Sequence, residues 1–198
     1  MFKIAINGFG RIGKLVTRRL FDLGLGENLV LINEQTGSIE NLATLLEFDS
    51  IHGHWTNNIE PGENFIKIDH HEIKVSNSSS ITALKRAISN VDLLIDCTGS
   101  NKNFNALQQY LDFGVKSVLV SSPIKDDRIL NIVYGVNHHR YDPTQNYLVT
   151  AASCTTNCLA PIVKVLNEQV GLRHGTITTI HNVTNSQTII DKPAGNIR

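Results

Sequence analysis

The sequence predicts an α/β fold built on a doubly wound parallel sheet, followed by the start of an α+β domain. Strand-like and helical patterns alternate as far as about residue 150. A glycine-rich turn joins the first strand to the first helix, which is typical of Rossmann folds. Beyond residue 150 we expect only one helix and one long strand. We therefore assign residues 1–150 to a dinucleotide-binding domain and residues 151–198 to the N-terminal part of a second, incomplete domain.

Composition narrows the class of protein. Apolar residues make up 41% of the 198 residues, enough for a sizeable core, and 18 basic residues balance 18 acidic ones. This zero net charge argues against nucleic acid or an anionic membrane surface as a partner. No apolar run approaches the roughly 18 residues of a membrane span, and the first strand leaves no room for a signal peptide. We therefore expect a cytoplasmic protein.

The cysteines and histidines predict neither a disulfide scaffold nor a metal site. The chain has three cysteines, too few for such a scaffold. The Cys154 and Cys158 pair and the His70–His71 pair lack further ligands nearby, so zinc is not expected at either.

The first element pair carries a nucleotide-binding pattern. Residues 2–7 read as a strand, and an apolar stripe at helical spacing runs from Ile12 to near Gly24. Between them the glycines permit a tight turn and close approach of the backbone to a pyrophosphate at the helix N-terminus. A glycine-rich turn without a ligand is the alternative. The candidate cofactor residues here are Gly8, Gly10, Arg11, Ile12 and Gly13.

Glu34 follows the second predicted strand, residues 28–33, at the spacing that a dinucleotide fingerprint requires. A carboxylate there can accept a hydrogen bond from a ribose 2′-hydroxyl and would repel a 2′-phosphate. We therefore expect NAD rather than NADP. The alternative is that Glu34 is a solvated loop acid.

The remaining elements of this domain follow in alternation. We expect helices at residues 39–48, 81–88 and 104–111, the last capped by Gly114, and strands at residues 65–69, 72–76, 91–97 and 116–121. The strands at 65–76 form a hairpin inserted in the fold. In open α/β sheets the ligand lies across the carboxyl ends of the strands, where this sequence has Thr98, Gly99 and Ser121.

Cys154 lies where a short strand, residues 147–150, gives way to a helix with Ser153 as its N-cap. The first turn of a helix has unpaired N–H groups and a partial positive charge, and both favour a thiolate. Most cysteines are small buried core residues, and that remains the alternative. We expect Cys158 to face the core and Cys97 to be a buried strand residue.

His181 lies in a β-branched run, residues 176–184, that reads as a strand after Gly175. A helix followed by an adjacent strand can bring Cys154 and His181 together. The alternative for His181 is a core or strand-end histidine.

The run Ser153 to Pro161, with His181 and Thr184 downstream, resembles the active-site signature of phosphorylating glyceraldehyde-3-phosphate dehydrogenases. This resemblance implies that residues 151–198 begin a catalytic domain and that Cys154 forms a thiohemiacetal and then a thioester, with His181 as general base. It implies NAD as cofactor and triose phosphate with phosphate or arsenate as reactants. Ser121 matches a position near the nicotinamide, and Ser153, Thr155 and Thr184 match positions that bind the substrate phosphate or the attacking anion.

Residues 48–55 and 171–175 resemble a side branch of that family, which accompanies bacterial arsenate-resistance transporters. The family resemblance also implies a homotetramer for a complete protein. Two other functions remain open, a non-catalytic NAD-binding fragment and an erythrose-4-phosphate dehydrogenase. Because the family's chains are longer, we expect a fragment or a truncated gene product that is poorly soluble and nearly inactive by itself.

Overall fold

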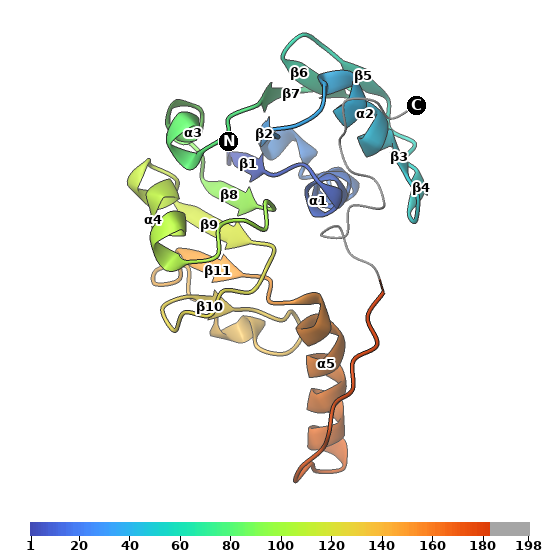
Figure 1. Cartoon of the computed structure of the whole chain (residues 1–198), viewed down its shortest axis with the longest axis vertical. Coiled ribbons are helices and arrows are strands. Elements are labelled where there is room, and N and C mark those ends of the chain that lie inside the picture. The colour runs from blue at the N-terminus through green and yellow to red at the C-terminus, as the bar shows by residue number, and fades with distance from the viewer. Residues whose placement is uncertain (183–198) are drawn as a thin grey trace.

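The computed structural model describes residues 1–182. Nine strands form one sheet in the order β10-β11-β9-β8-β1-β2-β7-β6-β5 (Figure 1). The parallel strands are β1 (Ile4–Asn7), β2 (Leu29–Asn33), β7 (His71–Ser76), β8 (Leu93–Asp96), β9 (Ser117–Val120), β10 (Leu130–Asn131) and β11 (Leu148–Thr150).

The two strands at the far edge run antiparallel, β6 (Phe65–Ile68) against β7 and β5 (Ile59–Pro61) against β6. A separate two-stranded ribbon pairs β3 (Phe48–Asp49) with β4 (Gly53–His54). The helices are α1 (Arg11–Asp22), α2 (Ile39–Glu47), α3 (Ile81–Ile88), α4 (Phe104–Asp112) and α5 (Cys154–Gln169), with short 3₁₀ turns η1 (Gly26–Asn28) and η2 (His138–Arg140). This is the doubly wound α/β fold that the sequence predicts.

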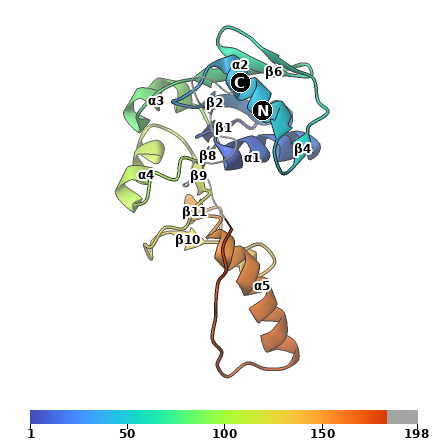
Figure 2. The same ribbon diagram turned by 45° about the vertical axis from the view of Figure 1, so that its right-hand side comes forward.

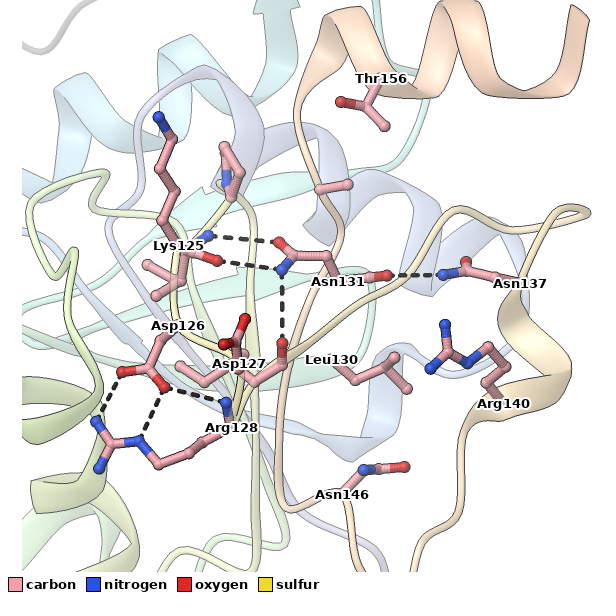
Figure 3. Close-up of a pocket in the computed structure, with 14 residues that line it drawn as sticks. Lys125, Asp126, Asp127, Arg128, Leu130, Asn131, Asn137, Arg140, Asn146 and Thr156 are labelled. Atoms are coloured by element: carbon pink, nitrogen blue, oxygen red, sulfur yellow. Dashed lines mark hydrogen bonds and ion pairs between the residues drawn. The ribbon is translucent and has the colours of Figure 1, made fainter. Parts of the chain in front are cut away.

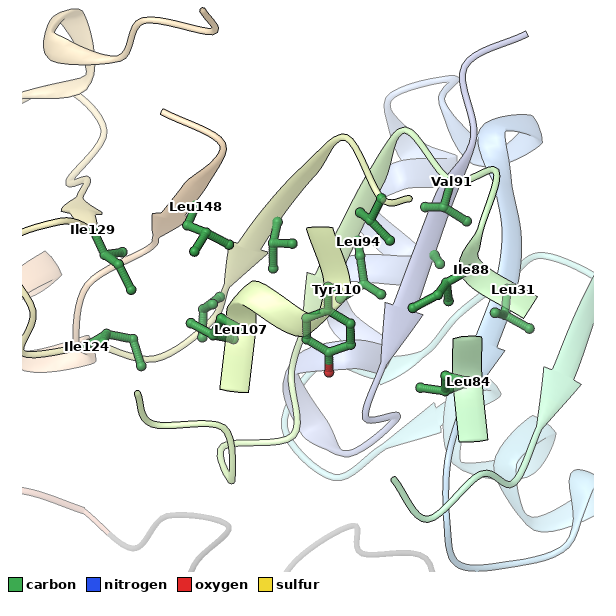
Figure 4. Close-up of a cluster of buried hydrophobic side chains, with 14 residues drawn as sticks. Leu31, Leu84, Ile88, Val91, Leu94, Leu107, Tyr110, Ile124, Ile129 and Leu148 are labelled. Atoms are coloured by element: carbon green, nitrogen blue, oxygen red, sulfur yellow. The ribbon is translucent and has the colours of Figure 1, made fainter. Parts of the chain in front are cut away.

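Helices cover both faces of the sheet, and the alternation of side chains along β1 shows why. Ile4 and Ile6 pack in the cluster beneath α1 and α2, whereas Ala5 between them packs in the cluster beneath α3 and α4. Figure 1 shows the two helix pairs on opposite sides of the strands. Figure 4 shows the cluster on the α3 and α4 side, with the Tyr110 ring among its aliphatic side chains.

The apolar stripe predicted for α1 is only partly buried. Ile12 and Leu23 are exposed, while the polar residues Thr17 and Arg18 are buried. Arg18 Nε donates to Leu46 O at 2.9 Å, and its Nη2 donates to Glu47 O and Gly53 O at 3.2 Å. The guanidinium therefore satisfies carbonyls at the C-terminal end of α2 and ties the two helices together.

The second part of the chain departs from the main body. α5 extends away from the sheet, and the segment that follows it runs back alongside the helix (Figures 1 and 2). Residues 176–182 form no strand, so the strand predicted for this run is wrong within the described residues. A β-branched run becomes a strand only where a neighbouring strand pairs with it, and no neighbour among the described residues does so.

Two cysteine predictions are also wrong. Cys158 is exposed on α5 instead of facing a core. Cys97 packs against the cluster beneath α1 and α2 but lies one residue beyond β8, outside the strand in which it was predicted. Within the described part of the chain, no helix combines the length and apolar character needed to cross a membrane.

Candidate active site

Cys154 is the first residue of α5, where the chain leaves β11. The turn between them puts Ala152 in the left-handed region at φ 56°, and the Ala152 N–H donates to Thr150 Oγ1 at 3.0 Å. Ser153 Oγ accepts a hydrogen bond from the Thr156 N–H at 3.0 Å, so Ser153 is the N-cap that the sequence predicts. The cap leaves Cys154 in the first helical turn, exposed to solvent.

His181 lies directly against this cysteine. Its Nε2 is 3.3 Å from Cys154 Sγ, and its Nδ1 is 2.6 Å from the carbonyl oxygen of Asn182. A carbonyl oxygen can only accept a hydrogen bond, so Nδ1 carries a proton and donates a hydrogen bond to the Asn182 carbonyl. In the neutral ring the basic nitrogen is therefore Nε2, which faces the sulfur.

Cys154 and His181 shift each other's pKa in the directions that favour their charged forms. The hydrogen bond with His181 is the largest influence on Cys154 and lowers the pKa of its thiol. Burial opposes this shift, and hydrogen bonds with Thr155 add to it. The Asn182 carbonyl, and then Cys154, raise the pKa of His181. Both directions favour a thiolate beside an imidazolium, the form in which cysteine is a nucleophile.

A cavity of about 380 Å³ opens onto this pair, lined by Cys154, Thr155, Cys158, Leu159, Ile162 and residues 177–182. Thr155 thus lies on the same cavity as Cys154 and His181. Ser153 does not line it, and its hydroxyl lies 2.7 Å from Thr156 Oγ1. Thr184 lies outside the described residues.

The glycine-rich turn after β1 is sterically closed to any side chain at two positions. Gly8 has φ 92°, and a Cβ there would lie 2.7 Å from the backbone of Cys97 and Thr98. A Cβ on Gly13 would lie 2.2 Å from the Gly8 carbonyl oxygen. Gly10 is the N-cap of α1, and Arg11 and Ile12 begin that helix. The turn therefore brings bare backbone and the helix N-terminus to the sheet edge, as a dinucleotide pyrophosphate requires.

Glu34 follows β2 and lies beside that turn. Its Oε2 accepts a hydrogen bond from the Phe9 N–H at 2.8 Å, and its Oε1 accepts from the N–H and hydroxyl of Thr36 at 3.1 and 3.0 Å. Each carboxylate oxygen can accept more than one bond, so the group can also accept from a ribose hydroxyl. The residues around the turn fit a dinucleotide in this respect.

Thr98, Gly99 and Ser121 follow the adjacent strands β8 and β9 at the same sheet edge. Thr98 donates through its N–H and its hydroxyl to Asp96 Oδ1, and Gly99 has φ 66°. The Ser121 N–H donates to Asp96 O at 2.9 Å, and its side chain hydrogen-bonds the Cys97 thiol. Burial raises the pKa of Cys97 to about 12, so this thiol is inert.

A larger cavity of about 850 Å³, which the sequence reasoning missed, lies beside the loop between β9 and β10 (Figure 3). Asn131 holds that loop by accepting from Thr150 Oγ1 at 2.6 Å and donating to Ile124 O at 3.1 Å. The charged run at residues 125–128 was the available signal. The lining of this cavity includes no cysteine or histidine, whereas Cys154, Cys158 and His181 line the smaller one. Among residues 1–182 no cluster of metal-binding side chains occurs.

Residues 2–104 match the family model of the glyceraldehyde 3-phosphate dehydrogenase NAD binding domain, and residues 153–198 match the C-terminal domain of the same enzyme. The chain belongs to the glyceraldehyde-3-phosphate dehydrogenase family. NAD is therefore the cofactor of its N-terminal domain, in agreement with the turn and carboxylate described above.

Curated members of the family align along nearly all of the chain. It is 43% identical over 196 residues to glyceraldehyde-3-phosphate dehydrogenase 3 of Nostoc sp., covering 99% of this chain and 58% of that protein. It is 40% identical over 198 residues to glyceraldehyde-3-phosphate dehydrogenase 1 of Bacillus cereus, covering 100% and 58% respectively. The chain thus spans somewhat more than half the length of these relatives.

Proposed function

We propose that Cys154 and His181 are the nucleophile and general base of an NAD-dependent oxidation of glyceraldehyde 3-phosphate. The observation that carries this proposal is the 3.3 Å contact between Cys154 Sγ and His181 Nε2, with Nδ1 committed to the Asn182 carbonyl. This arrangement meets the geometric requirement for an activated cysteine. Membership of the family supports the choice of an aldehyde phosphate as substrate.

In the first step the Cys154 thiolate attacks the aldehyde carbon, the carbonyl π electrons move to oxygen, and that oxygen takes the Nε2 proton of the His181 imidazolium to give a thiohemiacetal and a neutral imidazole. N–H groups in the first turn of α5 stabilise the developing negative charge on that oxygen. His181 Nε2 then takes the hydroxyl proton as the C–H electron pair departs, leaving a thioester on Cys154. When bound, NAD supplies the hydride acceptor that this oxidation requires.

The residues that would hold NAD are those at the strand ends. Gly8, Gly10, Arg11, Ile12 and Gly13 present backbone and a helix N-terminus to the pyrophosphate. The Glu34 carboxylate would accept from the adenosine ribose and disfavour the 2′-phosphate of NADP. Thr98, Gly99 and Ser121 would face the remaining half of the dinucleotide.

In the second step an oxygen of inorganic phosphate attacks the thioester carbon, the C–S bond breaks, and the Cys154 thiolate is restored as an acyl phosphate leaves. Arsenate in place of phosphate would give a labile acyl arsenate. We propose that Thr155, which lines the cavity, binds the substrate phosphate or the attacking anion. Ser153 and Thr184 have the same proposed role, which the family resemblance supports.

We further propose that the dinucleotide-binding domain ends near residue 150, with residues 151–198 in a catalytic domain, and that the complete enzyme is a cytoplasmic homotetramer. By itself the 198-residue chain should turn over slowly. Two features support this expectation: residues 176–182 have no strand partner among the described residues, and α5 exposes large apolar side chains.

The test of the proposed chemistry is to trap the thioester. The 198-residue chain is incubated with glyceraldehyde 3-phosphate and NAD without phosphate, and its acylation is read by peptide mass spectrometry with NADH formation in parallel. We expect an acyl group on Cys154 and one NADH per acyl group. Cys154→Ser should show neither, and Cys158→Ser should retain both. A non-catalytic NAD-binding protein would bind NAD without acylation, which would contradict the proposal.

A further inference from the structure

Four neighbouring strands each end in a polar residue, at the sheet edge where the cofactor-binding turns begin. Ser76, Asn33, Asn7 and Asp96 are the last residues of β7, β2, β1 and β8. They lie in register, Ser76 opposite Asn33, Asn33 opposite Asn7 and Asn7 opposite Asp96. Three of them are almost fully buried, with Asp96 only 1% exposed. The row therefore forms a buried floor directly beneath the turns that follow each strand.

Hydrogen bonds link the members of this row from one strand to the next. Ser76 Oγ donates to Asn33 Oδ1 at 2.8 Å, and Asn33 Nδ2 donates to Asn7 Oδ1 at 2.8 Å. The link from β1 to β8 passes through a residue of α4. Asn7 Nδ2 donates to the Tyr110 hydroxyl at 2.6 Å, and that hydroxyl donates to Asp96 Oδ2 at 2.9 Å.

Asp96 in turn fixes the loop after β8. Its Oδ1 accepts from the N–H and hydroxyl of Thr98 at 2.9 and 2.7 Å, and its Oδ2 accepts from Asn101 Nδ2 at 2.6 Å. Asn101 Nδ2 also lies 3.1 Å from the Tyr110 hydroxyl. One buried carboxylate thus sets the course of the loop that contains Thr98 and Gly99.

We propose that Tyr110 is a positioning residue for NAD, whose hydroxyl couples the glycine turn after β1 to the Thr98–Gly99 loop after β8. Burying a carboxylate costs desolvation free energy unless several donors hydrogen-bond to it. We therefore expect this network to fix the positions of the two loops more than it stabilises the fold. Tyr110 is 0% exposed in the core beneath α4, so it acts on the cofactor through its hydrogen-bond partners Asn7, Asp96 and Asn101.

The sheet order indicates which part of NAD depends on this link. β1 lies between β2 and β8, with Glu34 after β2 and the Thr98–Gly99 loop after β8. If Glu34 holds the adenosine ribose, the loop after β8 faces the half of the dinucleotide beyond the glycine turn. Loss of the Tyr110 hydroxyl should then weaken the binding of NAD more than the binding of AMP, which lacks that half.

The experiment measures the dissociation constants of NAD and AMP by calorimetry on the 198-residue chain, together with the melting temperature. For Tyr110→Phe we expect about a tenfold higher NAD dissociation constant, because a hydrogen bond to a charged group is lost, and an AMP constant within about twofold of wild type. Leu107→Val removes one methylene from the same helix and core cluster. It should lower the melting temperature without changing either constant.

A purely structural role for Tyr110 would lower the melting temperature of Tyr110→Phe and leave its NAD constant unchanged, and that result would overturn the proposal. Equal weakening of NAD and AMP would also overturn it. Asn101→Ala, at the half-buried end of the network, provides a second variant should Tyr110→Phe not fold. It should reproduce the selective loss of NAD affinity. The Cys154 chemistry does not enter this test.

Discussion

Two cysteines in this chain have opposite acidities for reasons that lie in their immediate surroundings. Cys154, in the first turn of α5 and 3.3 Å from His181 Nε2, has a lowered thiol pKa. Burial beside Asp96 raises the pKa of Cys97 to about 12, despite a hydrogen bond from Ser121. The same residue type therefore has a more acidic thiol after β11 and a less acidic one after β8, two strands away.

Glu34 is the residue on which cofactor selection should depend. Glu34→Gln keeps the size of the side chain but removes the negative charge that disfavours a 2′-phosphate. We expect the NAD dissociation constant to rise about tenfold, as a hydrogen bond to a charged group is weakened, and the NADP constant to fall. Calorimetric titration of both nucleotides checks this.

Glu72→Gln is the matched control, because Glu72 is an exposed acid on β7 of the same sheet. It should leave both constants unchanged. An unaltered ratio of NAD to NADP affinity in Glu34→Gln would show that Glu34 is only a loop acid that holds Phe9 and Thr36 in place.

At the scale of elements, Gly8 in the turn between β1 and α1 has both a positive φ and close backbone neighbours. Comparing it with Gly24, which has only the positive φ, separates the two effects on stability. Gly8→Ala should lower the free energy of unfolding by about 3 kcal/mol or more, because it adds left-handed strain to overpacking against the Cys97 and Thr98 backbone. Gly24→Ala has a similar positive φ of 70° and nothing within 4 Å, so it should cost only about 1 kcal/mol. Urea denaturation of both variants measures the difference, and equal losses would contradict this account.

Most elements of the first domain were predictable, because their side-chain patterns are long enough to show a period. Helix α3 occupies the predicted residues, and β2 and α4 differ from prediction by a single residue. The strands β5 and β10 were missed because two or three residues cannot show an alternating pattern. The β-branched run at residues 176–182 was wrongly predicted to be a strand. A strand forms only where a second strand pairs with it, and β propensity does not show whether such a strand is present.

In the candidate site, one contact was predictable from the sequence, whereas the hydrogen bonds that hold the cofactor-binding turns were not. The contact between Cys154 and His181 agrees with the sequence prediction, although His181 reaches the cysteine from an irregular segment. The hydrogen bonds from the Phe9 N–H to Glu34 and from the Tyr110 hydroxyl to Asp96 join residues 25 and 14 positions apart. Such contacts depend on which strands become neighbours, and local sequence patterns carry no record of that.

For the molecule as a whole, the exposed apolar surface of α5 should govern behaviour in solution. Ile162, Val165, Leu166 and Val170 are each at least 45% exposed on or just after this helix. Val165→Lys with Leu166→Lys should shift the 198-residue chain toward monomer in sedimentation velocity, because it removes apolar area that drives association.

The control for this comparison is Glu168→Lys with Gln169→Lys, which adds positive charge on the same helix without removing apolar area. Its sedimentation profile should match that of the wild-type chain. An equal shift toward monomer in both pairs would attribute association to charge and not to the apolar surface.

We infer that the fold places Cys154 against His181 and so favours its thiolate form. The rate of Cys154 alkylation by iodoacetamide as a function of pH tests this inference most directly. In the wild-type chain, peptide mass spectrometry should show Cys154 labelled ahead of Cys97 and Cys158. Its rate should rise at a pH below that of an ordinary thiol, because the thiolate is the reactive form and its pKa is lowered. In His181→Ala the rise should move to higher pH, whereas identical profiles in the two proteins would contradict the account.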